Sequence, residues 1–335
     1  MRPKTSIKYG LAVAFLWTNL VPVNSLAQSD WIAKLREMRT KSTQARLDFV
    51  EKGLTQAPEG ERPLLLMEKA LVLEAKGDFE RASAVYQEVL KSPGSLGEYA
   101  HLFSARLALQ GKKLEKAKLH FETLLEMSPN LQLQNEARFE LAKISLQEGK
   151  AAQARQMLTA LEKRNRGESV YPDLLWELAR SERALGNQPG FCKWLKKLFV
   201  SRPEDTRVIG WNSDLGVALV DQKPSGCSLT LEERRRRIKN LQWAGLSQKA
   251  RAEIEEIRNV KGEDPFDVVM LESHYLLHEG EVSEAMKLLL PHYDKKKTDF
   301  NYLTTLATAA ARSGETQLAV GSYYSASKLS PKSKL

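Results

Sequence analysis

Histidine and cysteine are the residue types in this chain that could bind a metal ion or form a covalent bond. His274 and His278 are four residues apart, so on a helix they would share one face, as the histidines of zinc proteases do. Such an enzyme also needs a glutamate directly after the first histidine as general base, and Tyr275 occupies that position. No third ligand is evident. We therefore expect no metal and no cofactor, and two histidines that are solvated or face a groove.

The chain has two cysteines, Cys192 and Cys227. An even number allows one disulfide in an exported protein, and two free buried thiols are the alternative. A bond between them would attach the end of an irregular stretch, 204–230, to the helical region before it. Closing a loop of this length would contribute about 3–4 kcal/mol. We predict the disulfide.

The first 27 residues have the pattern of a secretory signal. Residues 1–10 carry three basic residues and no acid, 11–23 are apolar, and small residues precede a cleavage point after Ala27. An uncleaved anchor is the weaker alternative, because the apolar run is shorter than the roughly 20 residues that span a bilayer. We predict export to the periplasm. Cleavage lowers the net charge from +9 to +6, which is no signature of nucleic-acid binding, so we expect no nucleic-acid partner.

Residues 232–237 read "EERRRR". Four consecutive arginines spread around the circumference of a helix, so they cannot all face one ligand. We expect a solvated helix in which the arginines pair with Glu232 and Glu233. The chain shows no nucleophile elbow, no phosphate-binding loop and no close Cys–His pair. The sequence therefore predicts no catalytic residue, and an unrecognised active site, were there one, would be sought in 204–230.

A repeat of about 35 residues organises most of the chain. It is clearest in "GDFERASAVYQEVLKSP" at 77–93 and "GETQLAVGSYYSASKLSP" at 314–331. The glycine suits the left-handed end of one helix, and the small residue after it lets the next helix approach closely. One such hairpin cannot cover its own apolar face, so neighbours must stack. The turn glycines are Gly77, Gly111, Gly149, Gly186, Gly245, Gly280 and Gly314, and the small-residue positions are Ala82, Ala117, Ala154, Phe191 (the exception), Ala250, Ala285 and Ala319.

This pattern resembles the tetratricopeptide repeat over about residues 64–334. The resemblance implies an all-α fold, a right-handed α-solenoid of stacked antiparallel helix pairs. Residues 30–58 lack the glycine turn, and there a single long helix is the alternative to a pair. The expected organisation is a signal peptide at 1–27, amino-terminal capping helices at 28–62, repeats one to four at 63–203, an irregular insertion at 204–230 and repeats five to seven at 231–335.

In the family that the chain resembles, the first helix of each pair lines a concave groove. When the repeats are aligned by their glycine and small residues, four successive units have a cation directly after the small or apolar residue of the first helix. The next unit has a histidine at the same position. Such a surface suits an extended peptide with acidic side chains or a free carboxylate. The predicted groove residues are Arg106, Leu109, Lys143, Leu146, Arg180, Arg183, Lys239 and His274.

The sequence thus predicts an exported scaffold that binds a protein or peptide ligand in its groove, without catalysis. The alternative is a peptidoglycan-associated protein, in an envelope complex, that is similar to the superhelical domain of soluble lytic transglycosylases. We expect no catalytic domain of that kind, because the chain ends at "SPKSKL". Apolar residues on both sides of the last predicted helix, 317–328, indicate a partner or a second copy of the chain at that end.

Overall fold

The computed structural model describes residues 30–92, 96–165, 169–205, 207, 227, 229–258 and 264–329. The regular elements in these ranges are helices, which confirms the predicted all-α class. The predicted signal, 1–27, and most of the insertion, 204–230, lie outside the described residues. Among the helices that are described, none combines the length and the apolar character needed to cross a membrane.

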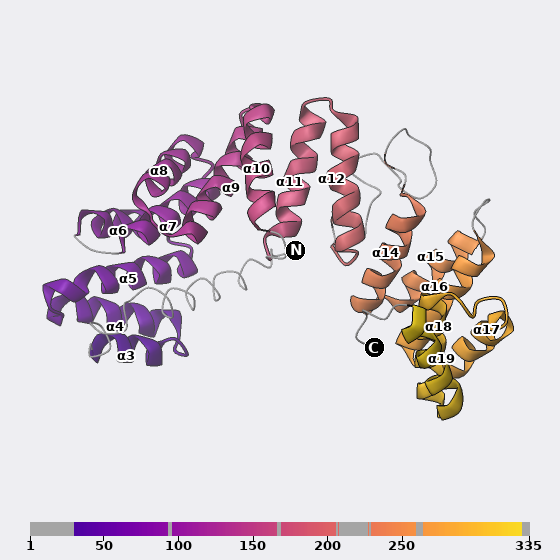
Figure 1. Ribbon diagram of the computed structural model, residues 1–335. Coiled ribbons are helices and arrows are strands. Elements are labelled where there is room, and N and C mark those ends of the chain that lie inside the picture. Colours follow the sequence, from indigo (N-terminus) through magenta and orange to yellow (C-terminus); the bar gives the residue numbers. More distant parts are fainter. Residues whose placement is uncertain are drawn as a thin grey trace. The chain divides into compact units, whose positions relative to one another are not determined.

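The chain divides into two compact units, residues 1–161 and 162–335, and each is described by itself. In the amino-terminal unit, successive helices pack side by side as hairpins, α5 with α6 and α7 with α8 (Figure 1). Its helices are α3 (Asp30–Met38), α4 (Thr43–Gln56), the 3-10 turn η1 (Glu59–Glu61), α5 (Arg62–Lys76), α6 (Phe79–Lys91), α7 (Gly97–Gln110), α8 (Leu114–Met127), α9 (Leu131–Gln147) and α10 (Ala151–Arg164), whose last turn crosses the division.

The carboxyl-terminal unit repeats the arrangement, with α11 against α12, α14 against α15, α16 against α17 and α18 against α19. The first helices of neighbouring hairpins also contact one another, α14 with α16 and α16 with α18. The elements are α11 (Tyr171–Ala184), α12 (Gln188–Ser201), α14 (Leu231–Trp243), α15 (Ser247–Arg258), α16 (Pro265–Glu279), α17 (Val282–Leu289), the 3-10 turn η2 (Leu290–His292), α18 (Phe300–Ser313) and α19 (Thr316–Leu329).

The small residues of the repeat lie where the helices of a hairpin meet. Ala82, Ala117, Ala154, Ala250 and Ala285 are fully buried, and their small side chains let the two helices of a hairpin approach closely. In the fourth hairpin, Phe191 takes this position and is also buried, at 2% exposed. Pro189 is tolerated in the first turn of α12, where a helix needs no backbone N–H. That hairpin therefore forms despite its departure from the repeat.

Side-chain caps define where many helices begin. Each accepts a hydrogen bond from a backbone N–H of the first turn, which has no partner inside the helix. The capping residues are Ser42, Asp78, Asn130, Asn187, Thr230, Asp264 and Asp299.

One predicted turn differs from the structure. Six of the seven turn glycines have positive φ, but Gly111 does not, and the adjacent Lys112 takes the left-handed conformation with φ of 55°. The reason is register: Lys112 lies five residues before Ala117, as Gly77 lies five before Ala82, whereas Gly111 lies six before it. Helix α7 is thus closed by the N–H of Lys113 bonding to Ala108 O at 2.8 Å, as Asp78 N bonds to Leu73 O after α5.

The segment 30–58 forms two helices, α3 and α4, and not one long helix. A small apolar cluster of Leu35, Val50 and Leu65 joins this pair to α5, with Trp31 against Phe49 at its edge. The capping pair is thereby attached to the first full hairpin.

Candidate functional site

The predicted groove cations of the amino-terminal unit lie on the first helices α7 and α9. Arg106 Nε donates to Glu136 Oε1 at 2.9 Å, and its guanidinium lies over the Phe103 ring. Lys143 Nζ donates to both carboxylate oxygens of Glu140, at 2.9 and 2.7 Å. Both cations are therefore paired with a carboxylate of the chain itself.

In the carboxyl-terminal unit, Arg180 on α11 is paired in the same way. Its Nη1 donates to both oxygens of Glu177, at 3.2 and 2.9 Å, and Glu177 is buried. Arg183, one turn further along α11, is exposed. Three of the four aligned cations are thus neutralised by neighbouring carboxylates. Sequence reasoning missed these acids, and it treated the cations as available to a ligand.

Lys239 on α14 differs from the other three cations. It is exposed, and within the described part of the chain no carboxylate pairs with it. Helical geometry places Arg236, Lys239 and Trp243 on one side of α14, together with Glu232, which pairs with Arg236 at 3.5 Å. Trp243 is 80% exposed. We call these four residues the α14 face.

His274 lies on α16, which contacts α14. Its Nε2 lies 2.9 Å from Thr305 Oγ1 on α18. Burial lowers the pKa of His274, and the positive charge of Lys239 lowers it further. His278 instead contacts the neighbouring Glu279 at 3.1 Å. Across the described residues, no three His, Cys, Asp or Glu side chains are grouped so that they could hold a metal ion.

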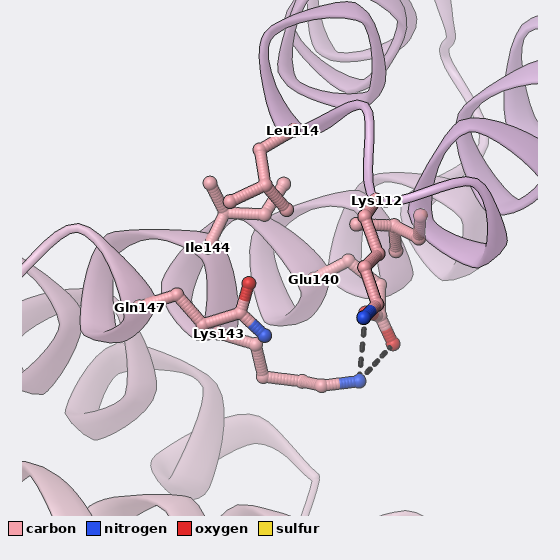
Figure 2. A pocket seen from close by; sticks show the side chains of 7 residues that line it. Lys112, Leu114, Glu140, Lys143, Ile144 and Gln147 are labelled. Atoms are coloured by element: carbon pink, nitrogen blue, oxygen red, sulfur yellow. Dashed lines mark hydrogen bonds and ion pairs between the residues drawn. The ribbon is translucent and has the colours of Figure 1, made fainter.

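The two predicted groove leucines are half-buried. Leu109 lines a pocket of about 390 Å³ between the end of α7, the start of α8 and α9 (Figure 2). Lys143 also lines this pocket, whereas Leu146 does not. The structure thus brings two of the predicted site residues, Leu109 and Lys143, to one cavity.

Glu74, at the end of α5, is a titratable group that the sequence did not single out as a site. Burial raises its pKa to about 6, although the Tyr86 hydroxyl, which donates to Glu74 Oε2 at 2.9 Å, and the charge of Arg106 both act to lower it. No motif marks this glutamate, because its environment depends on how α5, α6 and α7 pack.

The arginine run is not the solvated helix that the sequence indicates. Arg237 is 5% exposed, with Nε donating to Glu253 Oε1 at 2.6 Å, its Nη1 donating to the Phe199 carbonyl, and its guanidinium over the Phe199 ring. Arg235 pairs with Asp267 on α16 at 2.8 Å. Arg236 forms the expected pair within the helix, with Glu232. The run thus joins α14 to the helices around it.

Glu233 likewise has a different role from the predicted one. Its carboxylate accepts from Thr230 N at 2.8 Å while Thr230 Oγ1 accepts from Glu233 N, which is a capping box at the start of α14. The same carboxylate pairs with Lys196 on α12 at 3.1 Å.

Cys192 on α12 and Cys227 form a disulfide in the structure, with their Cα atoms 4.7 Å apart. Both side chains are buried. The amide of Gln188, one turn before Cys192, lies 3.5 Å from its sulfur. The bond attaches the chain around residue 227 to the second helix of the fourth hairpin.

Stacked helical hairpins joined by short turns define the class of helical-repeat proteins, which present extended binding surfaces. Residues 73–170 match the family model of a tetratricopeptide repeat-like domain. This match confirms the resemblance drawn from the repeat. No curated protein matches the chain in sequence.

Several solved structures are similar to the chain. A tetratricopeptide repeat protein from Parabacteroides merdae is 15% identical, with 88% of this chain and 96% of that one covered and a TM-score of 0.46. YrrB, described as having an unusual peptide-binding site, is 14% identical, with 62% and 98% covered and a TM-score of 0.44. The carboxyl-terminal part of a repeat protein from Cytophaga hutchinsonii is 10% identical, with 90% and 96% covered and a TM-score of 0.41.

Proposed function

We propose that the chain is an exported scaffold that binds a protein or peptide through the first helices of its hairpins and catalyses no reaction itself. The observation that carries the proposal is the α14 face, where an exposed tryptophan lies one turn from a lysine that has no carboxylate partner in the described residues. Tryptophan and basic side chains dominate the binding energy of many protein interfaces. The sequence pattern of 1–27 supports export.

The chemistry of the α14 face defines the ligand. Lys239 attracts an acidic side chain or a free carboxylate, and the Trp243 ring offers apolar area one turn away. Arg236 is itself paired with Glu232. Arg106, Lys143 and Arg180 likewise have carboxylate partners, so a ligand would have to displace these acids. Among the four aligned groove cations, Lys239 is therefore the one that could bind an acidic peptide without displacing a carboxylate of the described residues.

The test compares partner capture from the native envelope fraction by the wild-type chain and two variants. We expect Lys239→Glu combined with Trp243→Ala to lose a partner that the wild-type chain retains. The matched control is Lys287→Glu on α17, a second-helix lysine with 71% of its side chain exposed, and it should retain that partner. Equal capture by all three chains would overturn the proposal.

The alternative, a peptidoglycan-associated protein, is tested by a separate binding experiment with the same variants. Co-sedimentation of the chain with purified peptidoglycan, unaffected by Lys239→Glu and Trp243→Ala, would favour the murein-binding alternative over the protein scaffold.

A further inference from the structure

We propose that His101 and His120, which face each other in the α7–α8 hairpin, bind one divalent copper ion through their Nδ1 atoms. His101 is on α7 and His120 is on α8. Their Nδ1 atoms lie 3.0 Å apart, and their ring centroids lie 5.2 Å apart. The two histidines of α16 instead contact other side chains. The pair lies outside the α14 face, so the inference does not depend on the function proposed above.

The packing of the repeat does not require histidine at either position. In the α5–α6 hairpin the corresponding residues are Leu66 and Val85, which are 8% and 7% exposed. Two more hairpins have an apolar pair at these positions, Leu175 with Trp194 and Val269 with Leu288. An apolar contact therefore suffices for the fold, and the α7–α8 hairpin has two metal-binding side chains in its place.

A buried hydroxyl beside the pair is the second, independent observation. Ser104, one turn along α7 from His101, is 6% exposed, and its Oγ has no hydrogen-bond partner among the described residues. The repeat places it close to His120, because the corresponding residues of the α14–α15 hairpin, Arg237 and Glu253, bond to each other at 2.6 Å. Buried polar atoms are rarely left unpaired. A water molecule bound to the metal would give this hydroxyl a partner.

The distance between the two nitrogens suits a metal whose ligands stand at right angles. With each imidazole nitrogen about 2.0–2.1 Å from the metal, two nitrogens 3.0 Å apart subtend an angle of about 95° there. This is close to the angle in square-planar or tetragonal sites, which are typical of Cu²⁺ and Ni²⁺, and it is smaller than the tetrahedral angle of zinc sites. Of these ions, Cu²⁺ binds such ligands most tightly. The spacing therefore favours Cu²⁺.

Both rings are in the protonation state that a metal needs. Burial lowers the pKa of both His101 and His120, so both are neutral at pH 7 and each has one nitrogen with a free lone pair. In the metal-free chain one Nδ1 donates a hydrogen bond to the other. Cu²⁺ replaces this bond when the donor ring carries its proton on Nε2 instead, which is a change of tautomer that releases no proton.

The remaining coordination positions are open. The described residues offer no third His, Cys, Asp or Glu ligand, so water or an anion completes the coordination. The positive charge of Lys116 also acts on His120, and an anion bound to the metal would offset it. A pair of nitrogen ligands without a carboxylate does not suit Ca²⁺ or Mg²⁺, which take oxygen ligands. The site is therefore selective for a metal that imidazole binds well.

The experiment titrates the metal-free full chain with Cu²⁺ and with Zn²⁺ against a chromophoric chelator. We expect the tightest site to hold one Cu²⁺ and to bind Zn²⁺ at least about tenfold more weakly. Pulsed EPR of the Cu²⁺-loaded chain counts the coordinated imidazole rings, and it should find two. A count of one or none, or Zn²⁺ binding as tight as that of Cu²⁺, would overturn the proposal.

Three variants separate this pair from the other histidines. His101→Leu combined with His120→Val introduces the apolar pair of the α5–α6 hairpin, so this variant should fold and yet bind Cu²⁺ at least about tenfold more weakly. His101→Gln keeps a polar side chain and should reduce the ring count from two to one. The matched control, His278→Leu, removes an exposed histidine of α16 and should change neither readout. Full Cu²⁺ binding by the double variant, two rings in His101→Gln, or loss of the site in His278→Leu would contradict the assignment.

Discussion

Glu74 shows how one buried carboxylate connects stability to pH. Its pKa of about 6, against an ordinary 4.5, means that the folded chain takes up the proton more readily than the unfolded chain. The ionised carboxylate therefore destabilises the fold above pH 6. The penalty decreases as pH falls through 6, and it is absent below about 4.5, where both states are protonated.

We predict that Glu74→Gln raises the free energy of unfolding at pH 7.5 by about 2 kcal/mol, because the amide keeps an acceptor for the Tyr86 hydroxyl without carrying charge. The gain should shrink toward zero near pH 4. Urea unfolding of the two chains at both pH values measures it, with the exposed Glu88→Gln as control. A gain that does not depend on pH, or a loss of stability at pH 7.5, would contradict this account.

At the scale of the elements, we predict that one substitution in the turn after α7 stabilises the fold, whereas most mutations destabilise a protein. Replacing Lys112 with glycine should stabilise the chain by about 1 kcal/mol, because glycine adopts positive φ without steric cost. The complementary change, Gly149→Ala after α9, has the space for a methyl group but the same backbone conformation, with φ of 78°. It should destabilise by a similar amount. Chemical unfolding midpoints that move in the same direction for both variants would rule out this explanation.

Helix α14 provides a second comparison, between adjacent arginines. Arg237→Met removes a buried cation that bonds to Glu253 and Phe199, and it leaves Glu253 without its counter-charge, so we predict a loss of about 3–5 kcal/mol. Arg236→Met, at a position with 64% of its side chain exposed, should cost less than about 0.5 kcal/mol. Equal effects in thermal or urea unfolding would show that the arginine run is a solvated surface after all.

At the scale of the whole molecule, the disulfide is the covalent constraint. We predict that mass spectrometry of the chain, purified without reductant, finds Cys192 bonded to Cys227. Replacing both cysteines with alanine should then cost about 3–4 kcal/mol, the loop-closure entropy of a separation of 35 residues. Two alkylatable thiols in the protein purified without reductant would refute the bond.

Sequence periodicity predicts this fold because each hairpin buries the same types of residue at the same positions of the repeat. Even Phe191 is placed correctly, since burial at that position tolerates a larger apolar side chain. The register also contains the signal for Lys112, five residues before Ala117. The site is less predictable. The partner of Arg106 is Glu136, 30 residues further along on another helix, and the exposure of Trp243 depends on which neighbours pack against α14. Such features are set by tertiary contacts, not by local pattern.

The central claim is that the α14 face binds a protein or peptide. Site-specific photo-crosslinking tests it most directly, with a photoreactive phenylalanine analogue placed at Trp243 and, as control, at Lys287 on α17. The account predicts that position 243 crosslinks to one protein in the native envelope, that Lys239→Glu abolishes this product, and that position 287 gives none. Crosslinking at 287 but not at 243, or a product at 243 that persists with Lys239→Glu, would contradict it.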